Sequence, residues 1–112
     1  MEKSTETMNY TVVGVTFEGR QDILNEFYRS YKVGGSYGVR LVNEDGNPYD
    51  ANAVAVHLET EPGTYRQVGY LSRDVNVTAR SMARRLASAK LRSIGPNRKW
   101  QIGLTVDATY NI

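Results

Sequence analysis

Residues 100–110 read WQIGLTVDATY, and this stretch decides the fold class. Apolar or aromatic side chains occupy every second position, namely Trp100, Ile102, Leu104, Val106, Ala108 and Tyr110. A two-residue period places all of them on one face of an extended chain. We therefore predict a half-buried β-strand over 100–110, with Trp100 as part of its apolar stripe.

Shorter strand patterns recur toward the N-terminus. Their β-branched and aromatic residues predict strands over 10–17, 37–42, 54–58, 65–71 and 91–94. The segment 43–52 (NEDGNPYDAN) is dense in turn-forming residues and predicts a loop, whereas 21–31 predicts a short helix or a loop. Glu61-Pro62-Gly63 predicts a hairpin turn.

One substantial helix is predicted between these strands. Ser72 is a candidate N-cap, Asp74 suits the first turn, and the helical pattern continues to about Lys90. Its apolar stripe comprises Val75, Ala79, Met82, Ala83 and Leu86, and three arginines lie away from that stripe, namely Arg80, Arg84 and Arg85. Six short strands and one such helix favour a mainly β fold, a small antiparallel barrel with the helix at one end, similar in outline to oligonucleotide-binding barrels. We expect a flexible tail over 1–9 and a single domain over 10–112.

Composition narrows the class of function. The chain has 112 residues, 40% of them hydrophobic, with no cysteine and a single histidine, His57. Disulfides, thiolate metal sites and cysteine nucleophiles are thereby excluded. No apolar run suits a signal peptide or a membrane-spanning helix. The sequence predicts a cytoplasmic binding module without catalytic activity, metal or other cofactor.

Charge is distributed unevenly along the chain. Residues 66–99 carry nine basic residues against one acidic residue, whereas residues 1–65 carry five basic and ten acidic residues. A basic segment of this kind is typical of a surface that binds a polyanion, and it is also typical of a helix face that is merely solvated. Composition alone leaves both interpretations open.

Three ordered strings carry a resemblance to a known family. GVTFEGRQ (14–21), LVNEDGNPYDANAVAV (41–56) and VGYLSRD (68–74), followed by the helix, resemble the HIRAN domain. The resemblance implies a modified oligonucleotide-binding barrel that grips single-stranded DNA. In a relative attached to a helicase motor, the domain captures the free 3′-hydroxyl end of DNA. Here no G-x-x-x-x-G-K-[ST] phosphate-binding pattern is present, and the chain resembles the standalone HIRAN proteins of bacteria and phages.

The same resemblance assigns candidate residues. Tyr49 and Asp50 match the tyrosine at the terminal nucleotide and the aspartate that binds the hydroxyl. Phe17 stands at the position of the first-strand aromatic, and Tyr70 stands where the helicase relative has histidine. Thr16 departs from the relative, which has arginine there, and Arg20 is the neighbouring candidate to replace it. With a basic residue at the helix start and the late aromatic, the expected DNA-binding set is Phe17, Arg20, Tyr49, Asp50, Tyr70, Arg73, Arg80 and Trp100.

Side-chain chemistry supports some of these assignments on its own. An ionised carboxylate only accepts hydrogen bonds, so Asp50 suits a terminal hydroxyl donor, although an aspartate here also suits capping of the backbone of 51–53. Tyr49 lies in a polar loop without an apolar stripe to join, which makes it the strongest candidate for stacking on a base.

The predicted function is recognition of free 3′-hydroxyl ends of single-stranded DNA, in repair or replication. The alternative is a protein-interaction module that docks onto a helicase, nuclease or host-defence component. A phosphodiester-processing enzyme is a third class, and it would need a metal site that the sequence does not show.

Overall fold

The computed structural model describes residues 4–112, so the first three residues of the tail expected over 1–9 lie outside the described residues. The elements follow one another as β1 (Thr5–Val13), α1 (Arg20–Ser30), β2 (Val39–Asn43), β3 (Val54–Glu61), β4 (Thr64–Leu71), α2 (Arg73–Ser81), the 3-10 turn η1 (Ala83–Arg85), β5 (Leu86–Pro96) and β6 (Ile102–Asn111). The prediction of a mainly β domain is confirmed.

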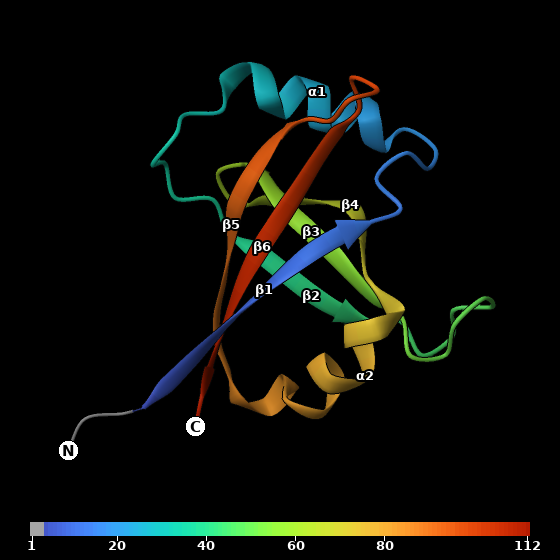
Figure 1. Cartoon of the computed structure of the whole chain (residues 1–112), viewed down its shortest axis with the longest axis vertical. Helices are drawn as coiled ribbons and strands as arrows, with labels where there is room; N and C mark the ends of the chain where they lie inside the picture. Colours follow the sequence, from blue (N-terminus) through green and yellow to red (C-terminus); the bar gives the residue numbers. More distant parts are fainter. Residues whose placement is uncertain (1–3) are drawn as a thin grey trace.

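The strands form one antiparallel sheet that curls into a small barrel. Their order is β2-β3-β4-β1-β6-β5, and an antiparallel bridge links Gly38, the residue before β2, to Lys90 of β5 at the other edge. The backbone N–H of Leu91 also donates to the carbonyl of Tyr37 over 2.9 Å beside this bridge. Closure of this kind removes unpaired edges from a short sheet. In Figure 1 the barrel stands upright with α1 over its upper end and α2 at its lower end.

The alternation in β6 is confirmed over the strand itself. Every second residue from Ile102 to Tyr110 is buried, and these side chains join the core with Val54, Val56 and Val68. The hydroxyl groups of Tyr10 and Tyr110 lie 3.0 Å apart inside this core and form a hydrogen bond. This bond gives both buried hydroxyl groups a partner where water is excluded. A two-residue period therefore places one face of β6 in the barrel interior.

Trp100 does not follow that stripe, and the expectation that it lies in the core is wrong. The chain reverses over 97–101, which we call the hairpin tip, and β6 begins only at Ile102. Trp100 adopts a positive φ of 60° within the turn, and its side chain is 82% exposed. The left-handed backbone conformation at Trp100 breaks the alternation of buried and exposed side chains. The two-residue period of β6 therefore does not extend to Trp100.

The predicted long helix ends early. Ser72 caps α2 as expected, because its side chain accepts a hydrogen bond from the N–H of Asp74 at 3.2 Å. The helix stops at Ser81, however, and β5 starts at Leu86, which pairs with Tyr110. Residues from Leu86 onward pair with the long strand β6, although their helical periodicity predicted a helix. The tertiary contacts of a strand here outweigh the local preference for a helix.

The first strand is displaced toward the N-terminus relative to the prediction. Residues 5–9, which the pattern placed in a tail, pair with β6. The strand ends at Val13, and residues 14–19 form a loop, called here the entry loop, with positive φ angles at Gly14 and Gly19. Phe17 therefore lies in a loop above the barrel wall, and not in a strand.

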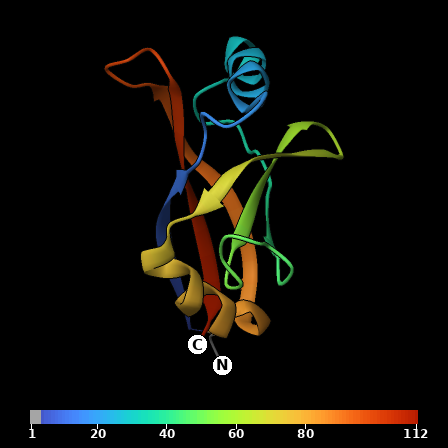
Figure 2. The same cartoon turned by 90° about the vertical axis from the view of Figure 1, so that its right-hand side faces the viewer.

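Two views show how the loops surround one side of the barrel. The entry loop and α1 lie at one end, and residues 44–53 between β2 and β3, called here the NPYD loop, lie toward the other (Figures 1 and 2). The ends of β1 and β4 cross between them, paired as Val12 with Leu71 and Val13 with Tyr70. This arrangement leaves a hollow between the two loops.

Candidate nucleic-acid interface

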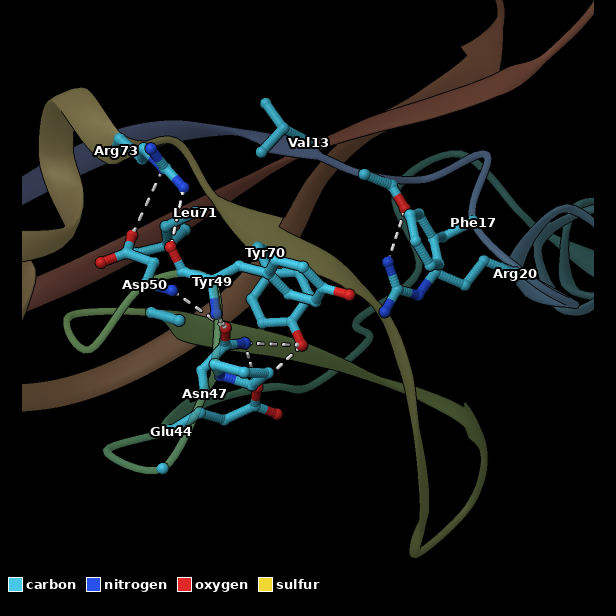
Figure 3. A pocket seen from close by; sticks show the side chains of 14 residues that line it. Val13, Phe17, Arg20, Glu44, Asn47, Tyr49, Asp50, Tyr70, Leu71 and Arg73 are labelled. Carbon is cyan, nitrogen blue, oxygen red and sulfur yellow. Dashed lines mark hydrogen bonds and ion pairs between the residues drawn. The ribbon is translucent and has the colours of Figure 1, made fainter.

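A cavity of about 790 Å³ lies between the entry loop and the NPYD loop. Its wall includes six of the side chains that the sequence singled out, namely Phe17, Arg20, Tyr49, Asp50, Tyr70 and Arg73. In Figure 3, Asp50 and Arg73 lie on one side, Phe17 and Arg20 on the other, and Tyr70 between them. Residues from distant parts of the sequence thus meet around one hollow.

Asp50 performs the capping role expected of an aspartate in a turn. Its Oδ1 accepts a hydrogen bond from the backbone N–H of Asn52 at 2.9 Å, and its Oδ2 accepts one from Nδ2 of Asn76 at 2.8 Å. Nε of Arg73 lies 3.7 Å from Oδ2, and the Asp50 side chain keeps 21% of its surface accessible. A carboxylate offers about four acceptor positions, so these contacts leave capacity for a further donor from the cavity.

Asn76 is a site residue that sequence reasoning missed. It is only 2% exposed, and it lies on α2 among side chains of the apolar stripe. Burial of an amide is costly unless the amide is hydrogen-bonded, and its bond to Asp50 meets that requirement. The available signal was a polar residue three positions before Ala79, on the face of the helix that the stripe assigns to the core.

Asn47 shapes the NPYD loop from within. Its Oδ1 accepts hydrogen bonds from the backbone N–H groups of Tyr49 and Asp50, at 2.9 and 3.1 Å, in the manner of an Asx turn. Its Nδ2 donates to Oε1 of Glu44 at 3.1 Å, and the hydroxyl of Tyr70 donates to the same oxygen at 2.7 Å. Glu44 and Asn47 therefore tie the loop to β4, a role that the sequence analysis did not assign to them.

Tyr49 extends from this loop into solvent at the rim of the cavity. Its side chain is 84% exposed, while its backbone carbonyl accepts a hydrogen bond from Nη2 of Arg73 at 3.0 Å. The backbone of Tyr49 is therefore held, and its ring is free to stack against a planar ligand.

At the opposite wall, the guanidinium group of Arg20 lies between two aromatic rings. Its carbon is 5.4 Å from the ring centre of Phe17 and 5.2 Å from that of Tyr70, within the range of cation–π attraction. Nη1 donates to the carbonyl of Gly14 at 2.7 Å, which fixes the plane of the group. A guanidinium has five N–H donors, so this geometry leaves donors for an anionic or carbonyl oxygen of a ligand.

Two predicted residues do not line the cavity. Arg80 forms an ion pair with Asp45, so it links α2 to the NPYD loop from outside. Trp100 lies on the hairpin tip, beyond the cavity wall. The structure thus brings six of the eight candidates together at the cavity, whereas Trp100 lies exposed on the hairpin tip and the Arg80 side chain is only 18% exposed beside Asp45.

Neither a metal-binding cluster nor a membrane-spanning helix is found within residues 4–112. No three His, Asp or Glu side chains in that range come together in a group that could hold a metal ion. Of the helices in the same range, none is both long and apolar enough to cross a membrane. The cavity combines aromatic rings, two arginines and carboxylates, which is chemistry suited to binding a ligand with planar and polar parts.

Comparison with known proteins agrees with this geometry. No curated protein and no solved structure matches the chain. The family model of the HIRAN domain matches residues 5–108, which include every strand except the end of β6, both helices and both loops of the cavity. A match over nearly the whole chain shows that this protein belongs to the HIRAN domain family.

Proposed function

We propose that this protein binds single-stranded DNA by its free 3′-hydroxyl end, in the cavity between the entry loop and the NPYD loop. The HIRAN family is generally linked to DNA binding, and the HIRAN domain is a binding domain and not a catalytic one. An end-binding module of this kind would serve DNA repair or replication in a bacterial or phage-infected cell.

The position of the Asp50 carboxylate is the observation that carries the proposal. It lies on the cavity wall, is oriented by Asn52 and Asn76, and keeps unused acceptor capacity. A terminal 3′-hydroxyl is a donor that an internal nucleotide has lost to its phosphodiester bond. An ionised carboxylate accepts a hydrogen bond from such a donor and repels a 3′-phosphate.

The remaining candidates have complementary roles in this proposal. Tyr49 at the rim would stack on the last base, and Phe17 and Tyr70 would contact it or its neighbour from the opposite side. Arg73 and Arg20, one on each side of the cavity, would contact phosphate oxygens. Trp100 and Arg80 would meet parts of the strand that lie outside the cavity.

Competition between matched oligonucleotides tests the proposal. A charge-assisted hydrogen bond contributes about 1.5–3 kcal/mol, so a 3′-phosphate in place of the hydroxyl should weaken binding about ten- to a hundredfold. Fluorescence anisotropy with a labelled strand and unlabelled competitors measures the ratio. Asp50→Ala should bind both kinds of end more equally, provided that circular dichroism and urea unfolding show a folded protein.

The matched control is Arg84→Ala, on η1 and away from the cavity. Loss of this exposed cation should weaken binding of hydroxyl and phosphate ends in parallel, because a long-range attraction does not distinguish them. If the wild-type protein binds both ends equally, Asp50 only caps the loop and the proposal of end recognition fails.

A further inference from the structure

The amide of Gln21 connects the entry loop to the first residue of β6, two places that lie far apart in the sequence. Its Nε2 donates to the carbonyl of Val15 at 3.0 Å and to the carbonyl of Ile102 at 2.9 Å. Its Oε1 accepts a hydrogen bond from the N–H of Ile102 at 2.8 Å. The side chain thus bonds both backbone groups of the first residue of β6 and the entry loop at the same time.

The other end of this connection is the hairpin tip. Oδ1 of Asn97 accepts hydrogen bonds from the N–H groups of Lys99 and Gln101, at 2.8 and 3.1 Å, so the turn is internally braced. The tip exposes Arg98, Lys99 and Trp100 side by side. A bulky residue with positive φ is strained, and Trp100 is held in that state with its ring in solvent.

Gln21 also stands next to a residue of the cavity. Arg20 lines the wall, and Gln21 follows it in the first turn of α1. Figures 1 and 2 both place the hairpin tip at the α1 end of the molecule and the NPYD loop away from that end. A strand whose end lies at Asp50 and that passes Phe17 and Arg20 would therefore continue toward the tip.

We propose that Gln21 is a positioning residue that holds the hairpin tip beside the open end of the cavity, so that the tip binds nucleotides on the 5′ side of the bound end. This inference rests on the proposed function. Arg98 and Lys99 supply cations for the phosphates of those nucleotides, and the ring of Trp100 supplies a flat surface for a base. The cavity and the tip then form one continuous track, and the GRQ string serves both parts.

A natural probe reports on the tip alone. Trp100 is the only tryptophan of the chain, so intrinsic tryptophan emission reports its surroundings without a label. Oligonucleotides of about 2 to about 12 nucleotides, all with a free 3′-hydroxyl, span the usual footprint of a small oligonucleotide-binding barrel. The shortest strands should bind without changing the emission. Longer strands should change it and bind at least about tenfold more tightly, because a stacked base adds to the affinity.

The Gln21 variants test the positioning role. Longer oligonucleotides should gain little affinity over shorter ones in Gln21→Ala. The substitution should therefore weaken binding of the longest strands about tenfold more than binding of the shortest strands. Gln21→Glu should behave similarly, because a carboxylate cannot donate to the carbonyls of Val15 and Ile102. The matched control is Asn25→Ala. This exposed amide of α1 bonds the carbonyl of Gln21 within the helix, and its loss should leave the length dependence intact.

Two further readouts separate positioning from a general structural effect. Once Trp100→Ala has removed the length-dependent gain, Gln21→Ala should add little, so the double variant should be non-additive on long strands. Lys99→Ala should lower the salt slope by about 0.7 with long strands and not with the shortest ones. If Gln21→Ala does not fold, Trp100→Ala and Lys99→Ala test the tip without touching the core.

The outcomes distinguish failure of this inference from failure of the proposed function. If strands bind with a preference for the 3′-hydroxyl, but length changes neither the emission of Trp100 nor the affinity, the tip is not part of the site and the inference is overturned. Equal losses of affinity for short and long strands in Gln21→Ala also overturn it. If no strand binds at any length, the proposed function itself fails.

Discussion

Nδ2 of Asn76 lies 2.8 Å from Oδ2 of Asp50, so a buried amide of α2 holds a carboxylate of the cavity wall. Asp50 belongs to the NPYD loop and Asn76 to α2, which begins after β4, so the bond joins two segments that are far apart in the sequence. Only an N–H group of the amide can face an ionised carboxylate, and the pairing therefore also sets the orientation of the amide. The acidic residue of the candidate site thus depends on a side chain without an exposed surface of its own.

Replacement of Asn76 by leucine should therefore affect both stability and end recognition. Asn76→Leu keeps a similar volume and removes the donor, and the free energy of unfolding should fall by about 1.5–3 kcal/mol, the usual range for a hydrogen bond to a charged group. Urea unfolding measures this change. The preference for a 3′-hydroxyl over a 3′-phosphate should also shrink in the folded variant. Val77→Ala, at a 59% exposed position of the same helix, is the control and should change stability by less than about 0.5 kcal/mol.

Gly69 lets β4 pass close to β1 at their crossing, next to Tyr70 of the cavity wall. A Cβ atom there would collide with the carbonyl oxygen of Val13 and lie 2.6 Å from Cγ1 of Val12. Gly69→Ala should lower the free energy of unfolding by about 1–3 kcal/mol, as overpacking against backbone does. Gly103→Ala in β6 is the matched control, since nothing lies within 4 Å of its added methyl group. Equal midpoints of urea unfolding for the two variants would contradict this account of the crossing.

Binding to DNA should weaken as salt increases. Each phosphate contact with a single strand contributes about −0.7 to the slope of log association constant against log salt concentration. If the basic segment 66–99 contacts about three phosphates, we therefore expect a slope near −2. Arg73→Ala should reduce the slope by about 0.7, because this arginine lines the cavity. Arg80→Ala should reduce it less, because Asp45 already pairs with that cation. Anisotropy titrations at several salt concentrations provide the slopes, and a flat response would exclude the basic segment as a DNA-binding surface.

Stability should decrease under mildly acidic conditions because of His57. Burial lowers the pKa of His57 from its ordinary value of 6.5, and Arg40 lowers it further, whereas Glu44 raises it. Below pH 6.5 the unfolded chain therefore takes up a proton before the folded protein does, and the free energy of unfolding falls with pH until the folded imidazole is also protonated. The neutral imidazole thus makes its full contribution to the free energy of unfolding above pH 6.5, and this contribution is lost as pH falls.

His57→Gln provides the comparison for that pH dependence. Urea unfolding of both proteins between about pH 7.5 and about pH 5 should show a smaller loss of stability in the variant, since glutamine does not titrate. The same loss in both proteins would assign the effect to other groups.

The NPYD loop shows how far sequence reasoning reaches into the candidate site. Turn-forming residues predicted a loop, the resemblance to the HIRAN family assigned roles to Tyr49 and Asp50, and the structure places both at the cavity. Asn47 and Glu44 lie in the same string, yet their bonds to the backbone and to Tyr70 are visible only once β4 lies beside the loop. Types of residue were predictable here, whereas their partners were not.

What the sequence by itself determined are the features that a few neighbouring residues decide. The two-residue period of β6, the Ser72 cap and the turn-rich loop depend on backbone preferences and on which face of a local element is apolar. Tertiary structure alone decided where α2 ends, that Gln21 bonds Ile102 and that Asn76 bonds Asp50. These outcomes depend on pairing between segments far apart in the chain. A local pattern holds no information about which distant backbone or side chain will compete for the same residue.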